Sequence, residues 1–327
     1  MGMATAQEGP GGAGSATTNR YWYDVNQIDQ LDNTSVSSWV NRGGNGTAAI
    51  QNALNARPFY REGGGLAING MPVLEMDGFD DRMVIPNDND LNTGASQTVR
   101  TFFVVVRTGA DVSSRQVIYE EGGSIRGLNI YINSGSLFWG AWNTPSDGVG
   151  SPWPFQFIST PISASTTYII GYTMAGNDAI TGTITGYLDG VEVGTMSGIG
   201  RLYAHSGAIG IGAKEGATVF ETGSSNGNGE RFSGEVAEFI HYNTVVTQAE
   251  RILVENYLSS KYNIAIGAND RHSMDSNGNG NYDYDVAGIG QAADASSSTD
   301  GQGSSIVRVS GANNLGNNEF LLWGHNG

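Results

Sequence analysis

Residues 234–264 change from the pattern of a β-strand to that of an α-helix. Val236 and Ile240 belong to an apolar run whose members fall on both faces of an extended chain, which predicts a strand buried in a sheet. Thr247 and Glu250 have the spacing of a capping box, which satisfies free amides at the start of a helix. The apolar residues that follow recur at helical spacing: Leu253, Val254, Tyr257, Leu258 and Tyr262. This stretch therefore predicts a central strand that leads into one amphipathic helix.

Most of the remaining chain has the pattern of short strands between turns. Glycine makes up 49 of the 327 residues, which is about twice its usual share of ~7%. Asp189 and Gly190 join two strand-like runs as a tight hairpin. We expect an all-β fold, a jelly-roll sandwich of two antiparallel sheets with one short C-terminal helix. The runs that predict strands are 99–107, 116–120, 127–132, 136–141, 167–173, 181–188, 191–196, 208–213 and 231–242.

Two further segments, residues 38–46 and residues 68–81, carry a family resemblance. The first contains Ser-Trp-Val-Asn-Arg-Gly-Gly-Asn-Gly, and the second begins Ile-Asn-Gly-Met-Pro-Val and ends Asp-Gly-Phe-Asp-Asp. With the strand and helix of 234–264, they resemble the laminin-G-like (concanavalin A-like lectin) domains of large secreted surface proteins of Bacteroidota. The resemblance covers about residues 19–265 and departs at Asn41, where the family has aspartate. It implies a module that binds and adheres rather than catalyses.

The composition changes after Ile264 and becomes polar and acidic. Residues 285–290 and 320–327 resemble parts of a β domain that often follows this lectin-like module. The predicted organisation is a flexible segment at 1–20, a sandwich at 21–265, a linker at 266–285 and an incomplete second β domain at 286–327. Ala4-Thr5-Ala6 is similar to the end of a signal-peptide cleavage site, so we expect a protein that is secreted or on the outer cell surface.

Charge and composition exclude several classes of function. The net charge of −16 repels nucleic acid and anionic membranes, and it favours cations such as Ca²⁺. The alternative is that this acidity only keeps a secreted protein soluble. The absence of cysteine excludes disulfides and thiolate chemistry. The longest strongly apolar run, residues 102–106, is too short for a membrane helix, so no direct insertion into a membrane is expected.

Residues 275–285 follow the pattern of an EF-hand calcium loop. Oxygen-bearing side chains stand at positions 1, 3, 5 and 9, with Gly280 at the sharp turn of position 6. Position 12, where the pattern needs glutamate, is Val286, and Asp285 one residue earlier is the candidate substitute. The alternative is a solvated linker. The predicted Ca²⁺ ligands, which would stabilise the linker, are Asp275, Asn277, Asn279, Asn281 (through its carbonyl), Asp283 and Asp285.

A second candidate cation site is formed by Asp77, Asp80 and Asp81, which cluster on a turn. Clustered carboxylates can hold a cation, and they can equally cap local amides with no ligand. Aromatic residues around the loop 146–154 predict a sugar-binding site, because flat rings stack on the C–H faces of sugars while polar neighbours bond the hydroxyls. The alternative is that the rings pack in the core. The predicted ligand-binding residues are Trp139, Trp142, Asn143, Asp147, Trp153 and Phe155.

Catalytic motifs are missing from the sequence. Glu235 and Glu238 are the nearest carboxylate pair, but a spacing of three predicts opposite faces of a strand, and Glu120 and Glu121 likewise point apart. We expect a non-enzymatic binding module of a large secreted protein, whose partner is a glycan or another surface polymer. One alternative is a stalk or filament subunit that associates with itself or with neighbouring domains. Another is a polysaccharide-degrading enzyme or its carbohydrate-binding appendage.

Overall fold

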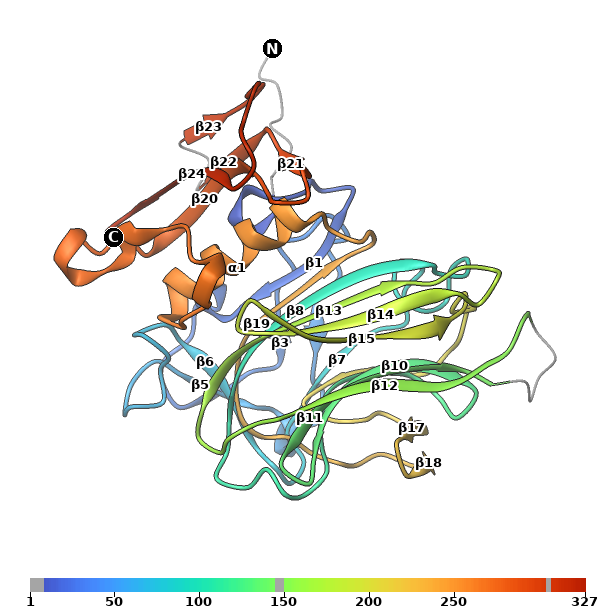
Figure 1. The fold of residues 1–327 in the computed structure, drawn as a ribbon. Coiled ribbons are helices and arrows are strands. Elements are labelled where there is room, and N and C mark those ends of the chain that lie inside the picture. Colours follow the sequence, from blue (N-terminus) through green and yellow to red (C-terminus); the bar gives the residue numbers. More distant parts are fainter. Residues whose placement is uncertain (1–8, 145–149, 304–306) are drawn as a thin grey trace, which may run out of the picture.

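The computed structural model describes residues 9–144, 150–303 and 307–327. Two large antiparallel sheets pack face to face, and a single α-helix lies on the outer face of one of them (Figure 1). The predicted all-β jelly-roll sandwich with one helix is therefore confirmed. We call the layer that carries the helix sheet A and the other layer sheet B.

Sheet A has nine strands, with the long strands β8 and β19 at its centre. Along the sheet the order is β15 (Val191–Ile199), β14 (Gly182–Leu188), β13 (Thr167–Ala175), β8 (Val99–Thr108), β19 (Ser233–Tyr242), β6 (Val73–Asp77), β5 (Phe59–Arg61) and β2 (Thr34–Ser35). β1 (Asn19–Asp24) pairs with the second half of β19, beyond the end of β6. The hairpin between β14 and β15 turns at Asp189 and Gly190, both with positive φ, as the sequence predicts.

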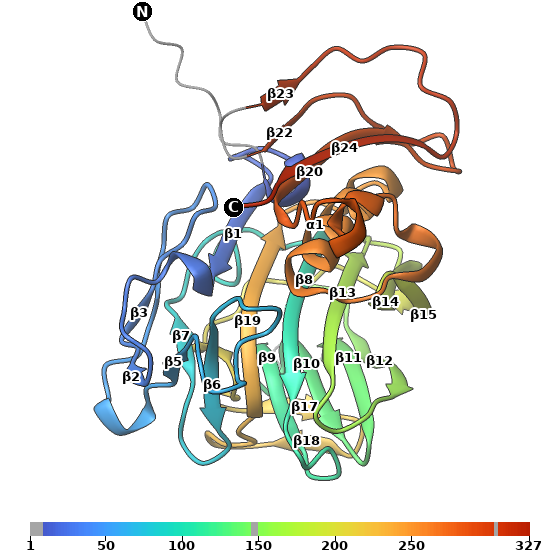
Figure 2. The same ribbon diagram turned by 90° about the vertical axis from the view of Figure 1, so that its left-hand side faces the viewer.

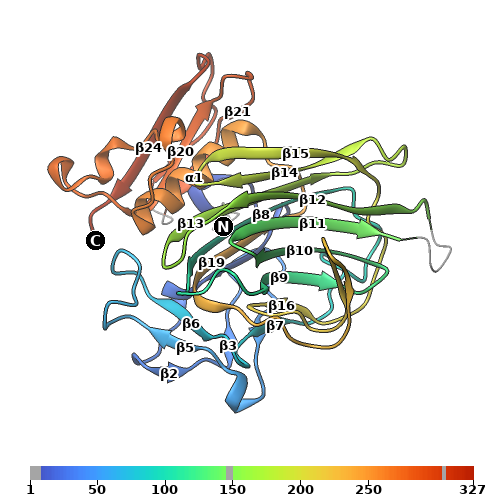
Figure 3. The ribbon, with the colours of Figure 1, turned by 60° about the horizontal axis from the view of Figure 1, so that its bottom comes forward.

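Sheet B has eight strands, seen from another side in Figure 3. Their order is β12 (Trp153–Pro161), β11 (Ser136–Asn143), β10 (Arg126–Asn133), β9 (Gln116–Gly122), β16 (Ile209–Ile211), β7 (Met83–Ile85), β4 (Ala49–Ile50) and β3 (Ser38–Trp39). A small hairpin of β17 (Thr218–Phe220) and β18 (Gly223–Ser225) follows β16. Strand β12 was not predicted from the sequence. It begins at Trp153, within the loop predicted at 146–154.

The alternation of side chains along β8 explains why its sequence is continuously apolar. Phe102, Val104 and Val106 face the interior between the two sheets. Phe103 and Val105 face the opposite way, toward the helix. Both faces are covered, so the strand buries every side chain of this run. The same holds for β19, which is the strand predicted from residues 234–242.

Helix α1 (Gln248–Tyr262) begins at the predicted capping box. The Thr247 hydroxyl accepts a hydrogen bond from the Glu250 amide at 3.2 Å, and the Glu250 carboxylate accepts one from the Thr247 amide at 2.8 Å. The helix ends at Asn263, which adopts the left-handed conformation. Among the described residues, none of the helices combines the length and the apolar character needed to cross a bilayer.

The C-terminal strands pack against α1 on the side away from sheet A (Figure 2). Phe320 and Leu322 contact the buried apolar cluster of the helix. The strands are β21 (Ser297–Ser298), β20 (Tyr284–Gln291) and β24 (Glu319–His325) in one sheet, and β22 (Gly301–Gly303) with β23 (Val307–Val309) in another. The domain boundaries at 265 and 285 stay a prediction.

The N-terminal segment departs from the expected flexible stretch at 1–20. Residues 1–8 lie outside the described residues, but Pro10–Gly12 form a buried 3-10 turn. A Cβ on Gly11 would lie 2.5 Å from the Leu253 carbonyl oxygen, so glycine lets the segment pack directly on α1. Residues 9–13 are therefore part of the packed structure, because Pro10–Gly12 fit between α1 and β22.

Candidate functional site

The three tryptophans of the predicted sugar-stacking site are buried, with relative exposures of 0% for Trp139, 0% for Trp142 and 2% for Trp153. Trp139 and Trp153 belong to the core between the sheets, whereas Trp142 lies flat against Gly127 on the outer face of sheet B. None of these rings offers a face to a sugar, and the stated alternative of core packing applies to them. Of the predicted aromatic residues, only Phe155 is half-exposed.

The two polar residues predicted to bind sugar hydroxyls are Asn143 and Asp147. Asn143 is fully buried. Its carbonyl accepts from Arg126 Nε at 2.8 Å, and its amide donates to the Ser151 carbonyl at 3.1 Å. Both polar ends are thus occupied by the protein itself. Asp147 lies outside the described residues.

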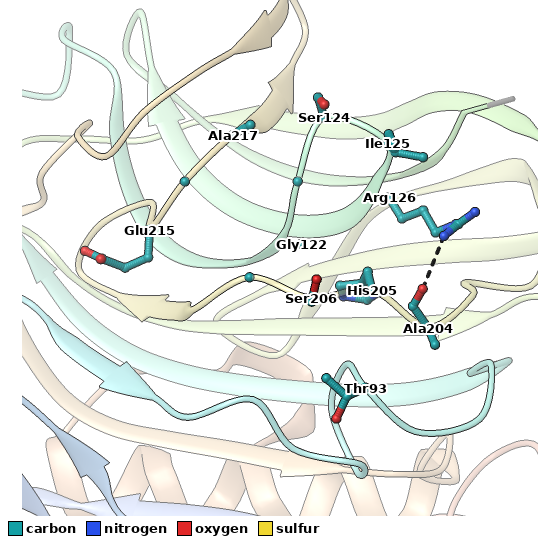
Figure 4. A pocket seen from close by; sticks show the side chains of 13 residues that line it. Thr93, Gly122, Ser124, Ile125, Arg126, Ala204, His205, Ser206, Glu215 and Ala217 are labelled. Atoms are coloured by element: carbon teal, nitrogen blue, oxygen red, sulfur yellow. Dashed lines mark hydrogen bonds between the residues drawn. The ribbon is translucent and has the colours of Figure 1, made fainter. Parts of the chain in front are cut away.

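A pocket of about 640 Å³ opens at one end of sheet B, where three loops meet. The turn between β9 and β10 supplies residues 122–126, the loop before β16 supplies 204–207, and the segment after β16 supplies 215–217, with Thr93 at the rim. We call this the loop pocket. Figure 4 shows Arg126 and Ala204 facing each other across it, joined by a hydrogen bond of 3.2 Å from Arg126 Nη1 to the Ala204 carbonyl.

Glycine is what lets these loops come together. Gly122 and Gly207 both have positive φ, at 115° and 150°. A Cβ on Gly207 would lie 2.5 Å from the Gly122 carbonyl oxygen, so a larger residue would force the loops apart. The sequence signal was Gly122-Gly123 directly after a strand. The meeting with 204–207 and 215–217 depends on the sheet order β10-β9-β16, which local patterns do not contain.

Behind the loop pocket, Glu121 is completely buried in an ion pair with Arg100. It also accepts from the Tyr119 hydroxyl at 2.7 Å, and His205 Nε2 lies 3.5 Å from Oε1. Burial is the largest single influence and would raise the pKa of Glu121, but Arg100, His205 and the Tyr119 hydroxyl together outweigh it and lower the pKa to about 2. Glu121 is therefore a charged structural group that does not act as a general acid.

The carboxylate of the pocket wall is also engaged. Glu215 pairs with Arg82 and, at 3.1 Å, with Arg231. Its side chain points away from Arg126 and His205 (Figure 4). The rim instead carries the exposed hydroxyls of Thr93, Ser124 and Ser206. Such a wall can bond a polyol, and the two carboxylates nearest to it are held in ion pairs.

The other predicted carboxylate pairs do not form a catalytic site either. A β-bulge between Val236 and Glu238 places Glu235 and Glu238 on the same, outer face of sheet A, so the prediction of opposite faces is wrong. Each is tied to a cation: Glu235 to Arg107 at 2.9 Å and Glu238 to Lys261 at 2.8 Å. Glu120 and Glu121 do point apart, as expected from their adjacency.

The predicted calcium ligands are not gathered around one point. Asp275 accepts from the Ser260 hydroxyl at 3.2 Å, and Asp285 lies 3.2 Å from His325 Nε2. Asp283 Oδ2 accepts from Asn281 Nδ2 at 3.0 Å, while its Oδ1 is buried without a hydrogen-bond partner. The other two side chains lie in a 3-10 turn, Asn277–Asn279. Calcium binding here stays a prediction.

The turn with Asp77, Asp80 and Asp81 does bring carboxylates together. One oxygen from each lies within 4.8 Å of the others, the only such group of His, Cys, Asp or Glu in the described part of the chain. Asp77 Oδ1 accepts from the Phe79 amide at 2.7 Å, which is the Asx-turn named as the alternative. Burial and the neighbouring Asp77 raise the pKa of Asp81 to about 7.

Comparison with known proteins matches structures but not sequences. A scan against protein-family models matches none, and no curated protein matches the chain. The binding domain of Paraclostridial Mosquitocidal Protein 1 has a TM-score of 0.51 at 13% identity, covering 75% of this chain and 54% of that one. The chain therefore shares the β-sandwich fold of that domain. At this identity the likeness shows the fold alone.

Two other similar structures are the botulinum neurotoxin serotype D binding domain, with a TM-score of 0.49 at 10% identity, covering 75% of this chain and 52% of that one, and domain 4 of an extracellular arabinanase from Geobacillus stearothermophilus in complex with arabinotriose. The latter has a TM-score of 0.46 at 10% identity and covers 72% of this chain and 96% of that one. The matched part spans about half the length of the two toxin chains.

Proposed function

We propose that this chain is a non-enzymatic binding module that takes a sugar unit of a glycan in the loop pocket. The observation that carries the proposal is the pocket itself, which is about 640 Å³ in volume and rimmed by hydroxyl groups and glycine backbone. Pockets of this size with a few placed polar groups are the usual sites for small polar ligands. The carboxylates beside it, Glu121 and Glu215, are held in ion pairs, which favours binding over hydrolysis. The mosquitocidal-protein structure of similar fold is itself named a binding domain.

The test is a glycan and polysaccharide array with the wild-type chain and with rim variants. Ser124→Trp and Ser206→Trp place a bulky ring at the pocket mouth and should abolish binding without unfolding the chain, because both residues are exposed. Ser297→Trp makes the same exposed change on β21, away from the pocket, and should bind as wild type. A blank array for the wild type, or equal binding by all variants, contradicts the proposal.

We also propose that this binding occurs outside the cell, within a larger surface protein. The support is the acidic balance and the resemblance of residues 38–46 and 68–81 to lectin-like surface modules. Detection of the parent protein on intact cells by antibody, with loss of signal after external protease, tests this placement. A signal that appears only after lysis contradicts it.

Calcium is proposed as the ion of residues 275–285. The support is the spacing of the oxygen side chains and the buried Asp283 Oδ1, which has no hydrogen-bond partner. Binding would draw Asp275 and Asp285 toward Asp283. A rise in Tm with Ca²⁺ relative to EDTA, lost in Asp275→Ala and in Asp283→Ala, tests this binding.

A further inference from the structure

A row of aromatic rings crosses the outer face of sheet B. Neighbouring ring centroids are 5.9 Å apart for Trp142 and Phe155, 5.6 Å for Phe155 and Phe157, and 5.7 Å for Phe157 and Phe138. Tyr131 continues the row beside Phe138 at 4.8 Å. We call these five rings the aromatic row. Its ends are buried, whereas Phe155 and Phe157 on the edge strand β12 are half-exposed.

Glycines in β10 and β11 let these rings lie close to the sheet. A Cβ on Gly127 would lie 2.6 Å from Cζ2 of Trp142, and a Cβ on Gly140 would lie 2.5 Å from Cε2 of Phe155. Any other residue at either position would lift the ring off the backbone. The row is therefore a platform built into the sheet, in which neighbouring rings are tilted to one another by 9° to 55°.

An unpartnered acceptor lies beside the half-exposed part of the platform. Asn129 is fully buried, and its Oδ1 has no hydrogen-bond partner. Its Nδ2 donates to the Val219 carbonyl at 2.8 Å, which fixes the orientation of the amide because a carbonyl only accepts. The same Cβ on Gly140 would lie 2.5 Å from Oδ1, so this oxygen lies next to the Phe155 ring. Because this oxygen is buried, a donor from a ligand would reach it only if the Phe155 ring moved aside.

The aromatic row is continuous with the loop pocket. Trp142 Nε1 donates to the Gly123 carbonyl at 2.8 Å, and Gly123 lines the pocket. Gly127, on which the Trp142 ring rests, directly follows the pocket residue Arg126. Trp142 itself is fully buried, so a chain-like ligand that leaves the pocket on this side would pass over it toward Phe155 and then Phe157.

We propose that Phe155 and Phe157 bind the sugar units that follow the one held in the loop pocket, so that the chain recognises an oligosaccharide rather than a single sugar. This inference rests on the proposed glycan-binding function. Sugar rings have C–H faces that pack on flat aromatic rings, and hydroxyls that need acceptors such as Asn129 Oδ1. An apolar protein segment could use the rings and donate a backbone amide to that acceptor, but it would not match the hydroxyls that rim the adjoining loop pocket, which makes it the less favoured occupant.

The experiment is calorimetric titration with ladders of arabinose, xylose and glucose oligomers, from monosaccharides to hexasaccharides, together with the ladder of any sugar that binds on the array. We expect affinity to rise with chain length. Phe157→Ala should lower the affinity for the longest oligomer about tenfold, as truncation of an aromatic contact does, and leave the monosaccharide unchanged. Phe157→Leu should show the same loss, and it keeps the buried apolar part in case the alanine variant does not fold.

Phe59→Ala is the matched control, because Phe59 is 39% exposed on β5 of sheet A and should have no effect. Binding that does not depend on chain length, or that both Phe157 variants retain in full, overturns this inference and leaves the pocket function standing. A wild-type chain that binds none of the ladders and none of the array sugars overturns both. Capture of apolar peptides with no response to any oligosaccharide would assign the aromatic row to a protein partner.

Discussion

The two outer faces of the sandwich are covered in different ways. On sheet A, helix α1 closes the face and buries Glu238, whose two oxygens accept from Trp22 Nε1 at 2.6 Å, the Tyr262 hydroxyl at 2.8 Å and Lys261. On sheet B, the segment that follows β16 leaves Glu120 with one bond, from the Glu215 amide at 3.3 Å, and one unpartnered oxygen. Two equally buried glutamates thus differ in how many hydrogen bonds their oxygens accept. The chain itself supplies the partners on the outer face of sheet A, and it leaves one acceptor without a partner on the outer face of sheet B.

The charge balance sharpens this contrast. Lys261 lies 2.8 Å from Glu238 and 2.8 Å from Asp24. Burial alone would lower the pKa of the Lys261 ammonium, but the two carboxylates raise it, so this lysine stays charged. Burial raises the pKa of Glu238, and the neighbouring Lys261 opposes that rise. No described cation forms an ion pair with Glu120, and burial raises the pKa of Glu120 well above its ordinary value.

The largest expected effect follows from removing the ammonium group of Lys261 on the outer face of sheet A. Lys261→Met leaves Glu238 buried without a counter-charge and leaves Asp24 with Arg42 alone, which should lower the free energy of unfolding by about 3–5 kcal/mol. Urea denaturation followed by tryptophan fluorescence measures it. Asp178→Asn, which loosens the solvent-exposed pair with Arg201, is the control and should change little. If Lys261→Met were as stable as the control, α1 would not depend on this cluster.

Glu120 should respond to pH in the opposite sense from Glu121, whose folded pKa lies below its ordinary value. The folded pKa of Glu120 lies above the unfolded value, near 4.5, so its contribution to stability is complete below that pH and is lost as the pH rises toward the folded pKa. Glu120→Gln imitates the protonated form. The variant should therefore gain on wild type as the pH rises above about 4.5, by about 1–3 kcal/mol, the scale of an unsatisfied buried group.

The measurement is the difference in free energy of unfolding between the two proteins at each pH. Asp81 and Asp189, whose pKa values burial raises to about 7 and about 6, titrate in the same window and cancel in that difference. A difference that stays constant with pH would mean that Glu120 is charged and partnered throughout, and the contrast between the two faces would fail.

Local patterns predicted the elements but not which faces stay open. The capping box at Thr247 and Glu250 and the Asp189-Gly190 turn depend on neighbours in sequence, so they were found. The tryptophans were misplaced because a period of two separates the faces of a strand and does not say which is covered. The bulge before Glu238 reversed one such inference.

The loop pocket was missed for a related reason. Its walls are glycines, alanines and serines from three separate loops, and none of these residue types marks a site by itself. The pocket depends on the order β10-β9-β16 in sheet B. Between β9 and β16 the chain forms β10, β11 and β12 of sheet B and then β13, β14 and β15 of sheet A. Long-range pairing of this kind is not encoded in any short window of the sequence.

Asp283 Oδ1 is a buried oxygen without a hydrogen-bond partner, and it lies on the side of the molecule that carries α1. A bound Ca²⁺ would give this oxygen a partner. At ten times the dissociation constant, Ca²⁺ should stabilise the wild type by about 1.4 kcal/mol relative to EDTA, seen as a rise in Tm. Asp275→Ala and Asp283→Ala should lose this difference, whereas Asp270→Ala, outside the ligand pattern, should keep it. Identical melting of the wild type in Ca²⁺ and in EDTA would show that this oxygen is not a metal ligand.

The smallest expected effect is the loss of stability at Phe157, judged against its neighbour Phe138 in the aromatic row of sheet B. Phe138 is 9% exposed and stacks on Tyr131, so Phe138→Ala should cost about 3 kcal/mol of stability, as for other buried aromatic truncations. Phe157, which is half-exposed, should cost only about 1 kcal/mol when changed to alanine, since less apolar surface returns to water. Denaturant titration of both variants compares them directly. Equal losses would make Phe157 a packing residue like Phe138, whereas a clear gap means that the fold uses this ring little and leaves it available to a ligand.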